Sequence, residues 1–197
     1  FAARWAEVIF NISPDVADMV RFTQAVREDL NVIGRPANAC KILAAVMPFV
    51  GRSEAEAREK RDRVNALVHP LAGLSTLSAH ANTDLGRLDL DSPVDRVEGT
   101  GTQSLIRLAE RIAKEEKLTL RDIGQRYGQG VLVPQICGTG RQVAEQLAEL
   151  FHDGGVDGFV FSPALLPESA DEFVDEVVPE LQRLGLLVWP EGGRLLA

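Results

Sequence analysis

The sequence has 197 residues and carries 21 Lys and Arg against 29 Asp and Glu, which gives a net charge of -8. This length is enough for one globular domain with a core of its own. The acidic balance argues against a nucleic-acid-binding protein, because phosphate binding needs clustered basic residues. The longest apolar run, Ile42 to Val50, has the length of a strand and is too short to cross a bilayer. Cys40 and Cys137 match no paired metal or redox spacing, which indicates free thiols in a reducing cytoplasm.

The first fifty residues alternate short apolar runs with a helical pattern. Val8 to Ile12 is rich in β-branched and aromatic residues, which predicts a strand. The tripeptide Ser13-Pro14-Asp15 offers a capping hydroxyl, a proline for the first helical position and an acid near the positive end of the helix. That helix is expected to run to about Leu30. Ile42 to Val50 is apolar almost throughout, the pattern of a parallel strand covered on both faces.

Helical patterns dominate the next part of the chain. Ser53 with Glu56 predicts a capping box at the start of a helix, and Thr119 with Asp122 predicts another. Residues 79–103 are polar and rich in turn residues, so an irregular segment is expected there. The helices predicted in this part cover residues 53–68, 71–77, 104–116 and a short stretch after Thr119.

The last third returns to alternating strands and helices. Val131 to Ile136 has an extended pattern, but Pro134 argues against a central strand. Gly138-Thr139-Gly140 begins a helix to Phe151, and Gly158 to Phe161 is a short buried strand. The last predicted helix has Ser169 and Glu172 as a capping box, ends at Gly185 and is kinked by Pro179.

This alternation is typical of an α/β fold with a parallel sheet. Three convincing strands are too few to cover the edges of an independent parallel sheet. The chain also begins at Phe1 within an apolar helical pattern. We therefore expect the chain to form part of a larger fold.

Six short segments together resemble one enzyme family. They occur in a fixed order along the chain: FAARWAEVIF (1–10), VGRSEAEA (50–57), LTLR (118–121), GTGRQVA (138–144), DGF (157–159) and VVPELQR (177–183). The chain resembles the bacterial-luciferase-like flavin-dependent monooxygenases, in the group of nitrilotriacetate monooxygenase component A and dibenzothiophene-sulfone monooxygenase. Residues 191–196 depart from the family's usual C-terminal tail, which leaves the role of the tail open.

The resemblance implies a (β/α)8 TIM barrel with a long helical insertion before its last strand. Val8 to Ile12, Ile42 to Phe49 and Gly158 to Phe161 would be the final three strands. Residues 1–197 would form the C-terminal part of a single barrel domain, with residues 51–155 holding the insertion and its flanking helices. The N-terminal half of the barrel would then lie before Phe1.

The resemblance also implies the chemistry. Family enzymes use reduced FMN, which a separate NADH-dependent flavin reductase supplies, and molecular oxygen to oxygenate a small organic compound, for example one containing sulfur or nitrogen. The residues that bind the flavin phosphate and activate oxygen would lie upstream of Phe1, so this chain alone is expected to be inactive, and no catalytic residue is assigned within it. A homo-oligomer is a family expectation. No cluster of His, Asp and Glu has metal-ligand spacing, so no metal is expected.

Active sites of such barrels lie at the carboxyl ends of the strands, which points to Phe10 and Ile12, to Met47 and Phe49, and to Phe161 and Ser162. The candidate substrate-binding residues are Phe10, Ile12 and His80, the last because the resemblance implies that the insertion folds over the barrel mouth. Phe10 and Ile12 alternate onto one face and would form an apolar wall; ordinary barrel packing explains them equally well. Met47 and Phe49 fit barrel packing better. His80 lies in the expected irregular segment, where it would either contact substrate or be hydrogen-bonded by its neighbours.

Three rival interpretations remain. Gly138-Thr139-Gly140 suggests a dinucleotide-binding loop, but Val143 stands where that motif needs a third glycine. Within the same fold, the enzyme could use a deazaflavin in place of FMN. The chain could also be a non-catalytic segment that serves subunit packing.

Overall fold

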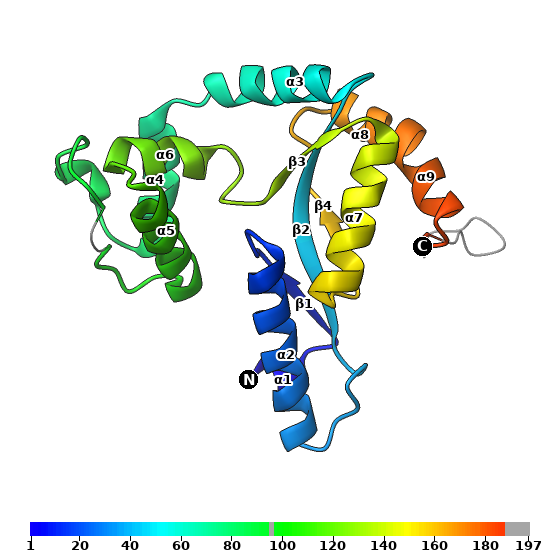
Figure 1. Ribbon diagram of the computed structural model, residues 1–197. Coiled ribbons are helices and arrows are strands. Elements are labelled where there is room, and N and C mark those ends of the chain that lie inside the picture. Colours follow the sequence, from blue (N-terminus) through cyan, green and yellow to red (C-terminus); the bar gives the residue numbers. More distant parts are fainter. Residues whose placement is uncertain (95–96, 188–197) are drawn as a thin grey trace. The chain divides into compact units, whose positions relative to one another are not determined.

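The computed structural model describes residues 1–94 and 97–187, so the divergent tail at 191–196 lies outside the described residues. It divides the chain into two compact units (Figure 1). The sheet unit comprises residues 1–61 and 133–197, and the helical unit comprises residues 62–132. None of the described helices is long and apolar enough to span a membrane.

The sheet unit is built on a parallel sheet whose centre is β2 (Lys41–Val50). β1 (Val8–Asn11) pairs with the first part of β2, and β4 (Gly158–Phe161) pairs with Leu43 to Val46. All of these pairs are parallel, which confirms the predicted α/β class with a parallel sheet. β1 ends one residue earlier than predicted, so Ile12 follows the strand.

A fourth strand, β3 (Gln135–Gly138), pairs with the last part of β2. The sequence favoured no strand here because of Pro134. Pro134 in fact precedes the strand, where its missing N–H is not needed, and its carbonyl accepts a hydrogen bond of 2.8 Å from the Met47 N–H. The prediction of only three strands was therefore wrong.

Pro48 lies within β2 without disrupting it. In a parallel strand, successive backbone N–H groups point to opposite neighbours. The Met47 N–H donates to the carbonyl of the residue before β3, and the Gly51 N–H donates to the last residue of β3. The Val46 carbonyl accepts from the Ser162 N–H on the β4 side. The nitrogen of Pro48 therefore faces the β4 side, where the register with β4 has ended at Val46.

Two helices, α2 (Val16–Val32) and α7 (Gly140–Gly154), lie along one face of the sheet (Figure 1). Ile42 and Ala44 of β2 pack with Met19 of α2. Val46 and Val50 pack with a group of α7 residues, Val143, Ala144 and Leu147. The short helix α1 (Ala2–Trp5) contributes Ala3 to a smaller cluster with Leu30 and Cys40.

The caps of these helices differ in part from the prediction. Asp15, and not Ser13, is the N-cap of α2, and its carboxylate accepts a 2.8 Å hydrogen bond from the Asp18 N–H. Ser13 is buried and its hydroxyl accepts a 2.6 Å hydrogen bond from the Asn11 amide. Thr139 caps α7 in a capping box with Gln142, which confirms the helix-cap interpretation of this segment.

The C-terminal segment is one helical rod of three parts. α8 (Glu168–Glu172) continues into the π-helical turn η2 (Phe173–Val177) and then into α9 (Val178–Arg183). Pro179 has no N–H to bond the carbonyl four residues earlier, and the π turn lies directly before it, where the sequence predicted that the proline interrupts the regular helix. Ser169 lies inside α8 and accepts from the Leu165 N–H, so the predicted capping box with Glu172 was wrong.

Helix α3 (Glu54–Ala66) leads into the helical unit, which contains α4 (Pro70–Ala81), η1 (Leu85–Arg87), α5 (Gln103–Glu116) and α6 (Leu120–Gly128). Its core joins apolar residues of all four elements, including Leu74, Leu85, Ile106 and Ile123. The predicted capping box at Thr119 is present. At Ser53 only half of the predicted box forms: its hydroxyl accepts from the Glu56 N–H, but the Glu56 carboxylate accepts from the Arg52 N–H. α4 is longer than predicted because Asn82 ends it in a left-handed conformation.

Glycines let α4 and α6 approach at backbone distance. A Cβ added at Gly73 would overlap the Gly124 carbonyl oxygen and lie 2.6 Å from the Gly128 nitrogen. Only glycine permits such an approach. The helical unit is thus closed around an interlocked helix pair.

The helical unit ends in a strained turn. Gly130, Val131 and Leu132 have φ values of 135°, 55° and 65°. The left-handed region is unfavourable for branched side chains. Leu132 is buried in the core of the helical unit and Val131 packs against it, so side-chain packing holds this backbone.

Candidate active site on the open face of the sheet

The face of the sheet opposite α2 and α7 is apolar, and its residues on β1 and β4 are exposed. Alternate residues of β2 point to this face, because Ile42, Ala44 and Val46 point to the helices. In register with them are Phe10 of β1, which is level with Leu43, and Val160 of β4, which is level with Ala45. Phe10 is 55% exposed and Val160 is 37% exposed. Strands that are apolar on both faces are typical of parallel sheets covered on both sides.

The open face is defined here by Val8, Phe10, Leu43 and Val160. Ala45 alternates onto the same side of β2 but is buried, with 1% exposure. Phe10 lies on the face of β1 that the helices do not cover, because Ile9 packs with the helix-side cluster. Ile12 is half-buried and follows the strand, so it is not part of the β1 ladder. Met47 and Phe49 are buried, with exposed fractions of 7% and 4%.

Polar groups gather at the carboxyl ends of the strands. Asn11 ends β1 and holds the buried hydroxyl of Ser13. Ser162 follows β4 and donates its N–H to Val46 at 2.9 Å. Phe161, considered as a site residue because it ends β4, instead stacks on Phe173 of η2 with ring centroids 4.4 Å apart. The sequence missed Asn11 and Ser13, because Ser13 matched the pattern of a helix cap.

His80 belongs to the helical unit. It lies in the last turn of α4, and not in an irregular loop as predicted. Its Nδ1 is 2.6 Å from the hydroxyl oxygen of Tyr127, which is fully buried on α6. Burial raises the pKa of Tyr127 to about 12, so the phenol stays protonated at neutral pH. The structure thus pairs His80 with a buried tyrosine inside one unit.

Comparisons with known proteins identify the family. A family model described as luciferase-like monooxygenase matches residues 1–158. The chain belongs to this family. It is 41% identical over 190 residues to dibenzothiophene-sulfone monooxygenase of Rhodococcus erythropolis, covering 94% of this chain and 42% of that protein. It is 37% identical over 188 residues to nitrilotriacetate monooxygenase component A of Aminobacter aminovorans, with the same coverage of 94% and 42%.

A solved structure agrees with these matches. The crystal structure of DmoA from Hyphomicrobium sulfonivorans superposes with a TM-score of 0.79 at 30% identity, covering 94% of this chain and 39% of that one. The chain therefore spans about two fifths of the relatives it matches. Both curated relatives named above are monooxygenases by name.

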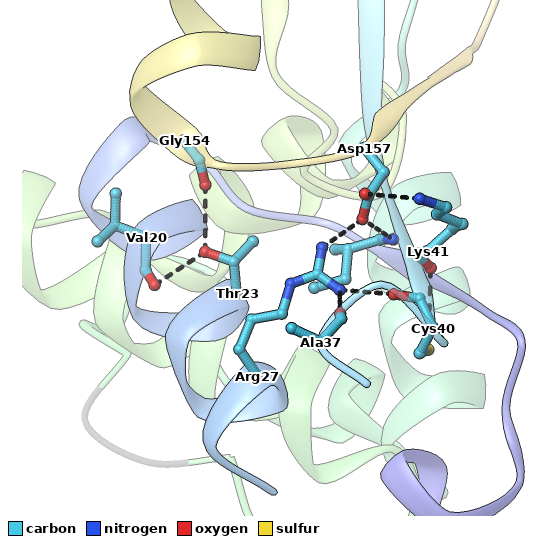
Figure 2. A network of polar contacts seen from close by, with 9 residues as sticks. Val20, Thr23, Arg27, Ala37, Cys40, Lys41, Gly154 and Asp157 are labelled. Carbon is cyan, nitrogen blue, oxygen red and sulfur yellow. Dashed lines mark hydrogen bonds and ion pairs between the residues drawn. The ribbon is translucent and has the colours of Figure 1, made fainter. Parts of the chain in front are cut away.

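In luciferase-like barrels, conserved function belongs to the carboxyl ends of the strands and stability to the amino ends. Asp157 lies at the amino end of β4 and contacts Arg27 at 2.5 Å and the Ile42 N–H at 2.8 Å (Figure 2). Arg27 also donates to the carbonyls of Ala37 and Cys40. Burial alone would raise the pKa of Asp157, but the Ile42 N–H and Arg27 outweigh it and hold the pKa below 3.8. This network fastens α2 to the strands, a structural task.

A polar hollow of about 440 Å³ lies elsewhere on the sheet unit. Its walls are Glu54, Arg58 and Arg61 of α3, Gln135 and Cys137 of β3, and polar residues of α7. Cys40 and Cys137 form no disulfide. Among the described residues no group of three or more His, Cys, Asp or Glu is placed to hold a metal ion. Charged walls do not suit an apolar ring, so the open face fits an aromatic ligand better.

Proposed function

We propose that the polypeptide containing this chain is an FMN-dependent two-component monooxygenase that oxygenates a small organic compound. The observation that carries this proposal is the open apolar face of the sheet in a chain that matches luciferase-like monooxygenases. Such a face suits one side of a flavin ring or an aromatic substrate. Bound reduced FMN would supply the oxygen chemistry, and the chain's own residues would position substrate and exclude water.

The barrel is part of the proposal. β1 and β4 both pair with β2 in parallel. α2 joins β1 to β2, and the long segment between β2 and β4 ends in β3 and α7. We assign β1, β2 and β4 as the last three strands of a (β/α)8 barrel. We assign residues 51–155 to the insertion and its flanking helices, which agrees with the separate core of residues 62–132. The remaining strands would cover the open face.

The roles of the site residues follow from their positions. Phe10 would form an apolar wall, because its side chain is exposed on the open face. Ile12 would continue this wall beyond the carboxyl end of β1. For His80 we propose a contact with substrate through the ring nitrogen that does not face Tyr127.

The substrate class follows from the same face. On the open face, Val8 is level with the charged Lys41 at the amino end, whereas Phe10, Leu43 and Val160 are uncharged, which favours a neutral organic compound, such as a sulfone, over a polycarboxylate. A separate flavin reductase is part of the proposal, because one relative is named as component A of its monooxygenase.

The test uses the complete polypeptide with FMN, NADH and a flavin reductase. We expect isotopically labelled oxygen to enter a neutral sulfone, and Phe10→Ala to raise KM by about tenfold through lost apolar contact. Val174→Ala, an exposed apolar residue on η2, is the matched control and should leave KM unchanged. Absence of oxygen incorporation with every sulfone and aminopolycarboxylate tried would refute the proposal. Tight binding of a reduced deazaflavin, and not of reduced FMN, would favour the other cofactor.

A further inference from the structure

The rod that follows β4 touches the carboxyl end of the sheet at several places. We propose that Lys60, Glu172 and Phe173 form a clamp that sets the positions of the carboxyl ends of β2 and β4. We call these residues the carboxyl-end clamp. Its residues are positioning residues for the active site, and this inference rests on the proposed function.

Lys60 provides the first half of the clamp. Its ammonium donates a 3.1 Å hydrogen bond to the carbonyl of Val50, the last residue of β2. The same ammonium forms an ion pair with Glu172 at the end of α8. The two side chains are only 20% and 25% exposed, so water screens this pair less than a surface pair. The end of β2 is thereby tied to the rod.

Phe173 provides the second half. Its ring stacks on Phe161, the last residue of β4, with 17° between the ring planes. Glu172 and Phe173 are adjacent in sequence. Through Lys60 the first contacts the end of β2, and the second contacts the end of β4 directly. The π turn that begins at Phe173 is fixed in turn by Gly140, where an added Cβ would overlap the Glu176 carbonyl. π turns occur often at functional sites.

Backbone hydrogen bonds between β2 and β4 stop before the end of β2. The last of them runs from the Ser162 N–H to the Val46 carbonyl at 2.9 Å, and Pro48 offers no donor for the next one. The last part of β2 pairs with β3 instead. Direct contacts between the end of β2 and the segment after β4 are therefore made by side chains, at the end of the strands where the active site of a barrel lies.

The first measurement is independent of flavin. In the complete polypeptide, Lys60→Met should speed hydrogen exchange about tenfold in residues 47–51 and 159–162, with little change in residues 41–44. Lys60→Arg keeps a donor and a charge and should restore slow exchange. Arg141→Met removes an exposed ion pair with Glu145 on α7 and serves as the matched control. Equal acceleration at both ends of β2 would show a general stabilising role and overturn the clamp.

The second measurement tests positioning. Lys60→Met, Glu172→Gln and Phe173→Leu should each raise the Kd for reduced FMN about fivefold and increase hydrogen peroxide release per oxygen consumed. Lys60→Arg should restore both values. Faster local exchange with unchanged flavin affinity and peroxide release would overturn the positioning role. If the unaltered polypeptide fails to bind reduced FMN, the proposed function is wrong, while the exchange measurement still decides whether the clamp exists. Should Lys60→Met not fold, the other two variants decide.

Discussion

The two units of this chain bury their apolar residues to different degrees. The helical unit closes a core on itself: Leu77, Ala81, Ile123 and Tyr127 have no exposed surface. In the sheet unit β2 is buried on both faces from Ala44 to Val50, but Val8 and Phe10 of β1 are 54% and 55% exposed. The helical unit therefore has the core of a self-sufficient fold, whereas the sheet unit leaves apolar side chains of β1 uncovered.

The largest effect is expected at the helix crossing that closes the helical unit. Gly73→Ala should destabilise this unit by about 3 kcal/mol, because the added methyl meets backbone atoms that cannot move aside. Gly86→Ala, whose Cβ would meet only the Asp84 side chain at 3.4 Å, is the control and should change stability by less than about 0.5 kcal/mol. Urea unfolding of both variants provides the comparison. Equal stabilities would mean that the crossing is looser than described.

A smaller loss is expected at the amino end of the sheet unit. Asp157→Ala removes the carboxylate that Arg27 and the Ile42 N–H contact and should lower the free energy of unfolding by about 2 kcal/mol. Asp153→Ala, at an exposed position of α7, is the control and should leave it almost unchanged. The pKa of Asp157 is lowered on folding, so its contribution is complete above the unfolded value of 3.8 and is lost as pH falls below it. The difference in melting temperature between the wild type and Asp157→Asn should therefore shrink in acid. A constant difference down to low pH would contradict this.

A loss of about 1 kcal/mol is expected for Tyr127→Phe, which removes the hydroxyl that contacts His80. Tyr127 is the only tyrosine of the 197 residues, so ultraviolet titration reports on it alone. Because folding raises its pKa from 10.0 to about 12, stability should fall as pH rises through this window. Tyr127→Phe should lack this fall. A phenol that titrates near 10.0 in the folded chain would show that the helical core is open.

The smallest effect tests the open face. Phe10→Ser should change the stability of the 197-residue chain by less than about 0.5 kcal/mol, because the side chain is largely exposed. In the complete polypeptide the same change should cost about 2 kcal/mol, since the proposed barrel buries the ring. Met19→Ala, on the helix side, should cost about 3 kcal/mol in both. If Phe10→Ser lowered the free energy of unfolding equally in the 197-residue chain and in the complete polypeptide, the proposed burial of the Phe10 ring by further strands would be wrong.

Apolar patterning was enough to predict the central parts of the fold. Ile42 to Val50 is apolar at every position, and β2 occupies it with a single added residue, Lys41. Local polar signals were less reliable. Ser13 and Asp15 both match a helix cap, and only burial of Ser13 against Asn11 decides between them. Likewise, no local sequence signal shows whether Pro134 lies inside a strand or just before one, and the structure places it just before β3.

The candidate site shows the same limit. Alternation along β1 predicted that Phe10 lies on one face, and the packing of Ile9 and Ile42 with the helices settles which face is open. The contact between His80 and Tyr127 joins residues far apart in sequence, so no local pattern reveals it. The ion pair of Lys60 with Glu172 also joins residues far apart in sequence, so no local pattern predicts it.

The strained turn at Val131 has a consequence for how sequence and stability are related. Replacing Val131 by glycine would relieve about 1 kcal/mol of backbone strain. It would also remove the partly buried Val131 side chain, which loses about 1 kcal/mol of apolar burial. Two opposed effects of similar size leave the total nearly constant. Backbone freedom at this junction can therefore change during evolution without a detectable change in melting temperature.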